Sequence, residues 1–384
     1  MKILMINTVC GVGSTGRICT DLAEVLEQNG HECKIAYGRG IVPEKYKKYA
    51  VKIGSDLDVK LHALQTRLFD NTGFGSKRAT KKFIRWVKEY NPDIVHLHNL
   101  HGYYINIEVL FNYLADADKP VIWTLHDCWT FTGHCAYYSY VKCNKWRTGC
   151  YNCPQKKAYP SSLFLDSSKN NWEQKKKLFT SVKKMTLVTP SKWLAGEVQR
   201  SFLDKYPVKV IPNGIDLDVF KPTPSDFRKK HNLEGKKIIL GVASTWDTRK
   251  GLNDFVELSK ILDENYKIVL VGVTVKQKKE LPKNILAIER TNNVQELAEV
   301  YTASDVLFNP TYEDNYPTVN LEAQSCGTPV VTYRTGGSIE SVPEKNVIEQ
   351  GMYKNLVHMG FSKVKEVMDK QDVSRNYIKV YEVV

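Results

Sequence analysis

The sequence of 384 residues has no apolar run that approaches the roughly 18 residues of a membrane span. Met1–Asn7 is a short apolar stretch that lacks the longer apolar core and small-residue cleavage site of a secretory signal peptide. Glycine (23) and proline (15) are not enriched, which excludes a collagen-like or low-complexity chain. No internal repeat is recognisable. We therefore expect a cytoplasmic globular protein, and at roughly 100–200 residues per domain its length predicts two domains, with three as the alternative.

Acidic residues are fewer than basic ones, 42 against 55, so the formal net charge is +13. A net positive charge indicates what a protein binds and not how it folds. Nucleic acid, an anionic membrane surface and phosphate-bearing substrates are all compatible with it. Residues 74–90 and 172–184 carry Lys and Arg at helical spacing beside apolar side chains. These stretches are either solvated surface helices or basic, aromatic-containing faces that rest on anionic lipid.

Short apolar stretches alternate with amphipathic ones, as in a parallel sheet covered by helices. Strands are predicted at Lys2–Asn7, Glu32–Tyr37, Ile94–His98, Val121–Leu125, Thr186–Thr189, Val208–Ile211, Ile238–Val242, Lys267–Val271, Ile285–Ile288, Asp305–Asn309 and Pro329–Tyr333. The turn-forming segment Ile211–Asp216 interrupts this alternation. The prediction is an α/β fold of two doubly wound, Rossmann-like domains, joined near residues 212–224 and facing a central cleft.

The segment Gly11–Gly16 has the spacing G-x-G-x-x-G after a predicted strand, which is a signature of dinucleotide binding. Its glycines begin later than the tight turn requires. The second strand ends in residues 37–39 (Tyr-Gly-Arg), without the acidic residue that holds a ribose, although the arginine leaves NADP open. The simpler interpretation is a loop around Gly13 that faces the cleft, with Arg17 in the first helical turn.

Histidines gather at two predicted strand ends. His126 follows one strand and is expected to point into the cleft, with a structural histidine bonded to Asp127 as the alternative. His96, His98 and His101 lie at the end of the neighbouring strand. A metal site made only of histidines is possible there, although no carboxylate accompanies it in the sequence.

Two segments of the C-terminal half place charge at predicted helix starts. Arg249 and Lys250 precede a glycine, where cations and a helix dipole converge on a phosphate. Further on, a loop carries Glu313 and Asp314 before a helix that begins near Pro317, and Glu322 lies more than a turn into that helix. Because the start of the helix separates the loop carboxylate from Glu322, the two are better placed to bind two parts of one long ligand than to act as the carboxylate pair of a glycosidase.

Together these motifs resemble the retaining nucleotide-sugar glycosyltransferases of family 4, which have the two-domain GT-B fold. The resemblance covers nearly the whole chain. It rests on the Gly loop with Arg17, on His126, on Ile211–Asp216, on Lys250-Gly251 and on the acidic-x7-Glu segment that ends in Glu322-Ala323. It implies transfer with retention, without a catalytic metal or other cofactor, from a nucleotide diphosphate sugar, with a UDP-sugar favoured over a GDP-sugar.

The resemblance also implies roles by position, with His126, Asp314 and Glu322 as the catalytic residues. His126 would hydrogen-bond the donor sugar, Lys250 the diphosphate and Glu322 the ribose hydroxyls. Asp314 and the backbone after it would hold the transferred sugar. The remaining donor-binding positions are Gly13, Arg17, Arg249, Asn315, Tyr316, Pro317 and Thr318, and base contacts are expected from Ile288–Asn292.

Two positions depart from the family pattern. The first member of the acidic-x7-Glu pair is usually Glu, but here it is Asp314, with Glu313 just before it, which leaves the donor sugar open. The usual phosphate-binding Arg falls on Thr245, and Arg249 is the obvious substitute.

The resemblance implies a hexosyltransferase of cell-surface polysaccharide or capsule biosynthesis, peripheral at the inner face of the plasma membrane. Its acceptor would be a saccharide linked to polyprenyl diphosphate, its surface partner an anionic membrane, and nucleic acid is not expected. The expected parts are an acceptor domain at 1–211 with a Cys-rich insertion at 128–160, a donor domain at 212–365, and a helix within 366–384 that packs back on the first domain. The alternatives are a nucleotide-sugar 2-epimerase and a non-catalytic saccharide-binding protein.

Five of the nine cysteines fall within Cys128–Cys153. The insertion around them spans about 30 residues, too short for a core of its own, so a cross-link is physically motivated. We predict a structural zinc ion held by Cys135, Cys143, Cys150 and Cys153, with Cys128 and His134 as alternative ligands. Free reduced thiols and two disulfides remain alternatives.

Overall fold

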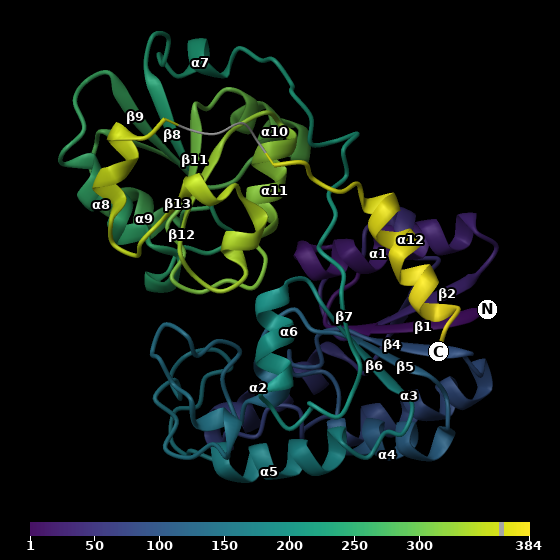
Figure 1. Cartoon of the computed structure of the whole chain (residues 1–384). Coiled ribbons are helices and arrows are strands. Elements are labelled where there is room, and N and C mark those ends of the chain that lie inside the picture. Colours follow the sequence, from purple (N-terminus) through teal and green to yellow (C-terminus); the bar gives the residue numbers. More distant parts are fainter. Residues whose placement is uncertain (361–364) are drawn as a thin grey trace. The chain divides into compact units, whose positions relative to one another are not determined.

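The protein is described here by a computed structural model that covers residues 1–360 and 365–384. Residues 361–364, near the end of the predicted donor domain, lie outside the described residues. The chain folds into two compact units (Figure 1): unit 1 comprises Met1–Pro212 and Gln371–Val384, and unit 2 comprises Asn213–Lys370. Each unit is a doubly wound α/β layer structure, which confirms the predicted fold class.

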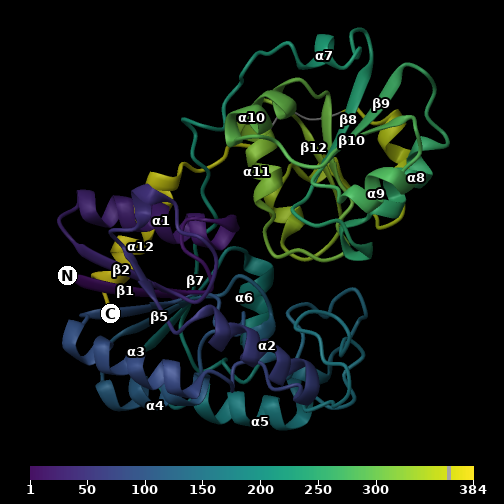
Figure 2. The same cartoon turned by 180° about the vertical axis from the view of Figure 1, so that it is seen from behind.

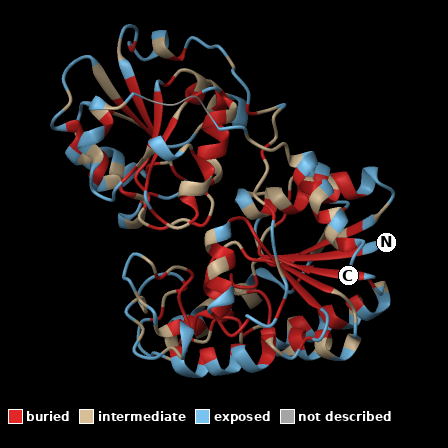
Figure 3. Ribbon diagram, in the orientation of Figure 1, coloured by how far each residue is buried: buried red, intermediate tan, exposed pale blue. Residues whose placement is uncertain are grey.

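Unit 1 contains a seven-stranded parallel sheet in the order β3-β2-β1-β4-β5-β6-β7. Its strands are β1 (Lys2–Asn7), β2 (Glu32–Tyr37), β3 (Ala50–Lys52), β4 (Ile94–Leu97), β5 (Val121–Thr124), β6 (Met185–Thr189) and β7 (Val208–Val210). Its helices before the linker are α1 (Gly13–Gln28), α2 (Asp56–Phe69), α3 (Lys77–Tyr90), α4 (Ile107–Ala117), α5 (Ser168–Phe179) and α6 (Lys192–Gln199). Apart from Lys2 at the start of β1, the central strands are buried (Figure 3), because helices cover both faces of the sheet.

The strand order of unit 1 reverses direction at β1, which pairs with β2 on one side and β4 on the other. Such a switch point leaves a crevice at the carboxyl ends of the two diverging strands. The loops that follow β1 and β4 meet there, since the Thr8 hydroxyl donates to the carbonyl of His101 over 2.5 Å. The fold therefore brings the Gly loop and the histidine-rich loop to one edge of the sheet.

The last helix, α12 (Lys370–Tyr381), belongs to unit 1 although the chain reaches it after unit 2. Tyr377 and Tyr381 are buried. The Tyr381 hydroxyl lies 2.7 Å from Nδ1 of His96, and the Tyr377 hydroxyl 3.1 Å from the hydroxyl of Thr124. The C-terminal helix is thus anchored in the polar interior of unit 1.

Unit 2 contains a six-stranded parallel sheet in the order β10-β9-β8-β11-β12-β13. Its strands are β8 (Lys237–Val242), β9 (Tyr266–Val271), β10 (Ile285–Ile288), β11 (Val306–Asn309), β12 (Val330–Tyr333) and β13 (Val347–Ile348). Its helices are α7 (Phe227–Lys230), α8 (Leu252–Ser259), α9 (Val275–Glu280), α10 (Val294–Thr302) and α11 (Thr318–Ser325). The switch point lies between β8 and β11, so the loops after these two strands are neighbours.

The two basic stretches form α3 and most of α5, but their apolar side chains point inward. In α3, Phe83 and Val87 are buried, and Trp86 stacks between Phe83 and Tyr90 at centroid distances of 5.9 and 5.0 Å. In α5 even Lys175 is buried: its Nζ donates to two carbonyls and lies 3.4 Å from the ring centroid of Trp129. Burial lowers the pKa of Lys175 to about 7. Most apolar side chains of the two helices thus face the interior, whereas Trp86 and Tyr90 stay partly exposed, and contact of these helices with anionic lipid stays a prediction.

No helix among the described residues has both the length and the apolar character needed to cross a membrane.

Candidate functional site

The Gly loop of unit 1 adopts a backbone that only glycine tolerates well. Gly11 and Gly13 have φ of +71° and +65°, in the left-handed region. A Cβ on Gly16 would lie 3.0 Å from the Val9 side chain, so the loop folds tightly over the start of α1. Arg17 lies in the first turns of α1 and is half-buried. The loop thus offers the backbone amides at a helix N-terminus to an anion or to hydroxyl groups.

Three histidines of unit 1 form a column in which His98 and His126 are stacked and His96 is tilted against His98. Nδ1 of His98 lies 3.0 Å from Nε2 of His126, and the His96 and His98 ring centroids are 4.1 Å apart. At the far end, His96 contacts Tyr381 through Nδ1 and Thr124 through Nε2, at 2.7 and 2.8 Å. His96 and His98 are buried, whereas His126 is partly exposed. His126 is therefore the member that a ligand can reach.

These imidazoles are held neutral. Burial lowers the pKa of His126 to about 4 and that of His96 to about 3, and it lowers the pKa of His98 well below its usual value. The neighbouring histidines also lower these pKa values, while the Asp127 carboxylate partly offsets the effect of burial by raising the pKa of His126. A neutral imidazole donates one hydrogen bond and accepts another, so the His98 contact restricts both the tautomer and the rotation of the His126 ring.

Asp127 has a different partner from the one that the sequence suggests. Its Oδ2 lies 2.6 Å from Nε2 of His101, and its Oδ1 accepts a hydrogen bond from the Trp129 amide. Nδ1 of His101 contacts the Tyr159 hydroxyl at 3.0 Å. Both pairs, His101–Asp127 and His98–His126, join loops that follow neighbouring strands. The adjacency of β4 and β5 is the signal that could have identified them.

In unit 2, Lys250 and Asp314 form one ion pair. Nζ of Lys250 lies 2.5 Å from Oδ2 of Asp314, and both side chains are mostly buried. Lys250 ends the short 3₁₀-helix Thr248–Lys250, and its own amide donates to Oδ1 of the N-cap residue Asp247 over 2.9 Å. Gly251 follows with φ of +73°, and a Cβ there would lie 2.3 Å from the Pro310 carbonyl, which requires glycine. The loops after β8 and β11 are thus held together by the Lys250–Asp314 ion pair and by the close packing of Gly251 against Pro310.

Arg249 strengthens the same junction. Its Nη1 donates to the Glu313 carbonyl over 3.1 Å, and its own carbonyl accepts from the Tyr312 amide. The Glu313 side chain is buried, whereas the Asp314 carboxylate faces Lys250. Asp314, which the sequence analysis takes as the first acidic position, is thus the carboxylate that pairs with Lys250. Thr245 is exposed, outside this junction.

The segment Asn315–Thr318 leads into α11, which begins at Thr318, with Pro317 as its N-cap residue. The sequence suggested that Pro317 is the first helical residue, and the helix begins one position later. Asn213 anchors the segment from the linker, since its Nδ2 donates to the Tyr316 carbonyl over 3.3 Å. The free amides at the start of α11 therefore follow Asp314 in the chain after only three residues, Asn315–Pro317.

Glu322 lies deeper in unit 2 than the other predicted residues. Its side chain is buried, and its Oε2 accepts a hydrogen bond of 2.9 Å from the buried hydroxyl of Tyr301 in α10. A buried carboxylate needs hydrogen-bond donors, and ribose hydroxyls are of that kind. The predicted base region Ile288–Asn292 begins at the last residue of β10, and Glu289 in it pairs with Lys278 at 3.1 Å.

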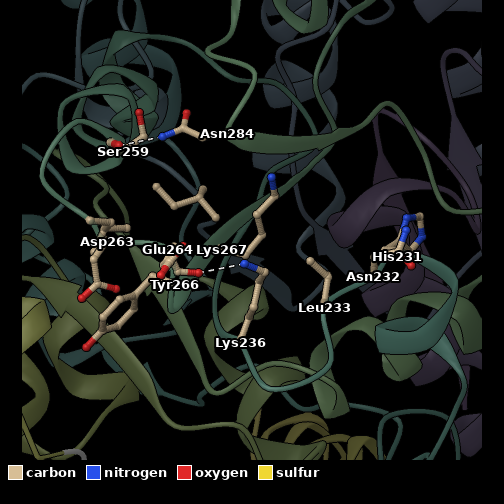
Figure 4. Close-up of a pocket in the computed structure, with 12 residues that line it drawn as sticks. His231, Asn232, Leu233, Lys236, Ser259, Asp263, Glu264, Tyr266, Lys267 and Asn284 are labelled. Carbon is tan, nitrogen blue, oxygen red and sulfur yellow. Dashed lines mark hydrogen bonds between the residues drawn. The ribbon is translucent and has the colours of Figure 1, made fainter.

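A pocket of about 290 Å³ lies at the opposite edge of the unit 2 sheet, where β8 and β9 begin. Figure 4 shows Lys236 donating to the Glu264 carbonyl and Asn284 donating to the Ser259 carbonyl, over 2.8 and 2.7 Å. Ligands of doubly wound sheets bind at the carboxyl ends of the strands, the edge that holds Arg249, Lys250 and Asp314. This pocket is therefore separate from the candidate site.

The four predicted zinc ligands, Cys135, Cys143, Cys150 and Cys153, line one small cavity together with His134. Contact with Cys153 raises the pKa of Cys135 well above its usual value, and the same contact lowers the pKa of Cys153 to about 7. Within residues 1–360 and 365–384, however, no group of three or more His, Cys, Asp or Glu side chains has a geometry that could hold a metal ion. A zinc site therefore lacks geometric support and stays a prediction.

Comparison with known families assigns both units. The family described as Glycosyltransferase Family 4 matches residues 15–219, and the family described as Glycosyl transferases group 1 matches residues 225–377.

Among curated proteins, the chain is 25% identical over 355 residues to the putative colanic acid biosynthesis glycosyl transferase WcaC of Escherichia coli, covering 88% of this chain and 85% of that protein. A processive diacylglycerol alpha-glucosyltransferase of Acholeplasma laidlawii is 27% identical over 38% of this chain and 47% of its own. Among solved structures, Anabaena HepE in complex with UDP-glucose has a TM-score of 0.65 at 15% identity, with both chains fully covered. That likeness shows the fold.

Proposed function

Because this chain belongs to Glycosyltransferase Family 4 and carries a group 1 glycosyltransferase unit, we propose that it transfers a sugar from a nucleotide diphosphate sugar to a saccharide acceptor. The Lys250–Asp314 pair, braced by Arg249, is the observation that carries this proposal. It places fixed charge of both signs at the carboxyl edge of unit 2, beside the start of a helix.

The chemistry of such a transfer calls for this arrangement. When the glycosidic bond to a diphosphate breaks, negative charge develops on the leaving phosphate. Cations that are already oriented stabilise that charge without reorganisation. Lys250 and Arg249 would do so, while Asp314 accepts hydrogen bonds from hydroxyls of the transferred sugar. In the substrate complex Lys250 would lie between the Asp314 carboxylate and the diphosphate.

Unit 1 would supply neutral contacts. An uncharged His126 can hydrogen-bond a sugar hydroxyl near the reacting carbon without competing for the diphosphate. Gly13 at the start of α1 and Arg17 in its first turns would face the phosphates and the acceptor. Glu322 would accept hydrogen bonds from the ribose hydroxyls, which would either replace the Tyr301 hydroxyl as donor or bind beside it. We propose transfer with retention and without a catalytic metal, as the family resemblance implies.

The donor base and the acceptor are also proposals. UDP is favoured, and HepE, which has the same fold, is described in complex with UDP-glucose. The relative from Escherichia coli is named for colanic acid biosynthesis, and that from Acholeplasma for a diacylglycerol acceptor. We therefore propose a hexosyl transfer in polysaccharide or capsule biosynthesis, to a polyprenyl-diphosphate-linked saccharide, by an enzyme peripheral to the inner face of the plasma membrane.

The test is a panel of UDP- and GDP-sugars, each incubated with the protein alone and with lipid-linked saccharide acceptors. The proposal predicts nucleotide release that increases with an acceptor and a new glycoside among the products. A changed sugar in the absence of acceptor would instead identify a 2-epimerase, and saccharide binding without turnover of any donor would identify a binding protein.

A further inference from the structure

Three loops of unit 1 meet at the edge of the sheet where the strand order switches at β1. The Arg39 amide, after β2, donates to the Thr8 carbonyl, after β1, over 3.1 Å. The loop after β2 also packs directly on the loop after β4, because Gly38 has no side chain: a Cβ there would lie 2.0 Å from the Cβ of Tyr104. This packing brings Arg39, which follows Gly38, to the same edge as Tyr103.

Tyr103 occupies this edge in a strained backbone conformation. Its φ is +68°, in the left-handed region that a residue with a large side chain rarely adopts. Most of the other non-glycine residues with positive φ are Asn or Asp, which tolerate this region better. Strain of this kind is found mainly at binding and catalytic sites. The edge is also where ligands of doubly wound sheets bind.

The Cys-rich insertion adds a second tyrosine to this edge. The Tyr159 hydroxyl lies 3.0 Å from Nδ1 of His101. The Tyr159 ring meets the rings of His101 and Tyr103 edge-on, at centroid distances of 5.5 and 6.2 Å. These contacts orient the ring, yet the residue is 44% exposed. Figure 2 shows the loops of the insertion beside α2. Tyr159 thus presents an oriented aromatic ring to solvent.

Arginines supply positive charge at the same place. Burial raises the pKa of the Tyr103 hydroxyl, and the guanidinium groups of Arg39 and Arg67 oppose that rise. Arg39 acts in the same way on the pKa of Tyr159. Arg67 is exposed, and Arg39 is half-buried and has no carboxylate partner among the described residues. Both tyrosines therefore lie close to the Arg39 cation.

One carboxylate belongs to the same neighbourhood. Asp127 lies near enough to raise the pKa of Tyr159. Its carboxylate is buried, however, and is already bound by Nε2 of His101 and by the Trp129 amide, at 2.6 and 2.9 Å. An approaching ligand therefore meets the charge of the two arginines and not that of Asp127.

This combination of side chains fits an acidic saccharide. A tyrosine ring packs against the C–H face of a sugar ring, and its hydroxyl can bind sugar hydroxyls. A guanidinium binds a carboxylate or a phosphate through paired hydrogen bonds. A neutral sugar would contact the rings but would leave the arginine without an anion.

We propose that Arg39, Tyr103 and Tyr159 form a subsite for an acidic acceptor, in which the rings contact a sugar and Arg39 binds a carboxylate or phosphate carried by that sugar. Calling the ligand the acceptor rests on the proposed function. The subsite itself is tested without donor or turnover. The Cys-rich insertion thus helps to select the acceptor.

The experiment is a ligand-observed NMR titration of the full chain with methyl glucuronide, methyl glucoside and glucose 1-phosphate. The first two probes differ only in the carboxylate. We expect at least one acidic probe to bind about fivefold or more tightly than methyl glucoside. The tighter of the two acidic probes identifies the anion as a carboxylate or a phosphate.

Variants separate the contribution of the charge from that of the ring. Arg39→Gln should abolish the preference for the acidic probe and leave methyl glucoside binding unchanged, whereas Arg39→Lys should keep part of the preference. Tyr159→Ala should weaken all probes by about threefold or more, and Tyr159→Phe, which keeps the ring, should weaken them less. Arg85→Gln, at an exposed arginine of α3, is the matched control and should bind as the wild type does.

Four results would overturn the proposal. They are no binding of either acidic probe, equal affinity for acidic and neutral probes, an acidic preference that survives in Arg39→Gln, and displacement of the acidic probe by UDP. The last result would place Arg39 in the donor site. Circular dichroism should show an unchanged fold in each variant. Absent glycosyl transfer with this binding pattern intact would refute only the proposed function.

Discussion

The two units hold their candidate site residues in opposite electrostatic states. In unit 1, the rings of His96, His98 and His126 are in contact, buried or partly buried, and neutral. In unit 2, Lys250 and Asp314 are a charged pair with Arg249 beside them. The difference matches two kinds of ligand chemistry: uncharged hydroxyls require neutral donors and acceptors, whereas a diphosphate requires fixed cations.

Removing Lys250 should therefore have the largest effect. Lys250→Ala takes away the cation and leaves the Asp314 carboxylate beside the phosphate, so we expect the transfer rate to fall by about 10²–10³-fold. Initial rates at saturating and limiting donor measure this loss. Lys260→Ala, which removes an exposed lysine paired with Glu257 in the same unit, is the control and should leave the rates unchanged. Similar rates for the two variants would contradict the claim that unit 2 uses the charge of Lys250 to stabilise the leaving diphosphate.

Glu322→Ala should weaken donor use by roughly tenfold to a hundredfold, the value of about 1.5–3 kcal/mol for a buried hydrogen bond to a charged group. Tyr301→Phe is the matched variant, because it deletes the hydroxyl that Glu322 binds and keeps the carboxylate. If Tyr301→Phe loses as much activity as Glu322→Ala, Glu322 acts by holding α10 and α11 together and not by binding the donor.

His126→Ala should lower turnover more than donor affinity, by about tenfold or more, because its proposed partner is the reacting sugar. His98 acts as a positioning residue for it. We expect His98→Asn, whose amide can occupy the place of Nδ1, to retain more turnover than His98→Ala, with the donor KM of both near that of the wild type. Equal losses in the two His98 variants would mean that the column is structural only.

The neutral histidines also make unit 1 sensitive to acid. In the folded chain His96 and His126 take up protons only near pH 3 and pH 4, whereas in the unfolded chain they do so near pH 6.5. The unfolded state thus binds more protons below that pH, and the free energy of unfolding falls as pH drops from about 6.5 toward 4, by up to about 1.4 kcal/mol per pH unit for each residue. Hydrogen exchange corrected for intrinsic rates should show unit 1 losing protection first, and equal loss in unit 2 would contradict this.

The smallest expected effect on chemistry concerns the cysteine cavity. Zinc held by Cys135, Cys143, Cys150 and Cys153 would fix the insertion without taking part in transfer. Elemental analysis of protein purified without added metal, together with a thiol count, decides this. Less than about half a zinc ion per chain, with the four thiols free or paired, would reject the prediction.

Most strands were predictable from the sequence to within a residue, because short apolar runs between helical stretches are characteristic of buried parallel strands. The exceptions, β3 (Ala50–Lys52) and β13 (Val347–Ile348), are too short to show any periodicity. The positions of Lys250 and Asp314 were predicted separately as diphosphate and sugar ligands. Their direct pairing depends on β8 and β11 being neighbours, which the order of elements along the chain does not reveal.

The orientation of helices was less predictable. The leucines of α2 have the spacing of a core-facing stripe, yet the loop Gly73–Ser76 binds His62 and turns them outward. The lysines of α5 suggest a solvated face, yet Lys175 is buried under Trp129. In both helices a few tertiary hydrogen bonds override the local hydrophobic pattern, and such bonds are not visible in the periodicity of one segment.

The most direct measurement is the affinity for UDP by isothermal titration calorimetry, with the wild type, Lys250→Ala and Lys260→Ala compared at one ionic strength. If unit 2 binds the nucleotide diphosphate at the junction of Lys250, Arg249 and the start of α11, Lys250→Ala weakens binding by roughly tenfold or more while Lys260→Ala binds as the wild type does. Unchanged UDP affinity in folded Lys250→Ala protein would contradict this assignment and place the phosphate site elsewhere.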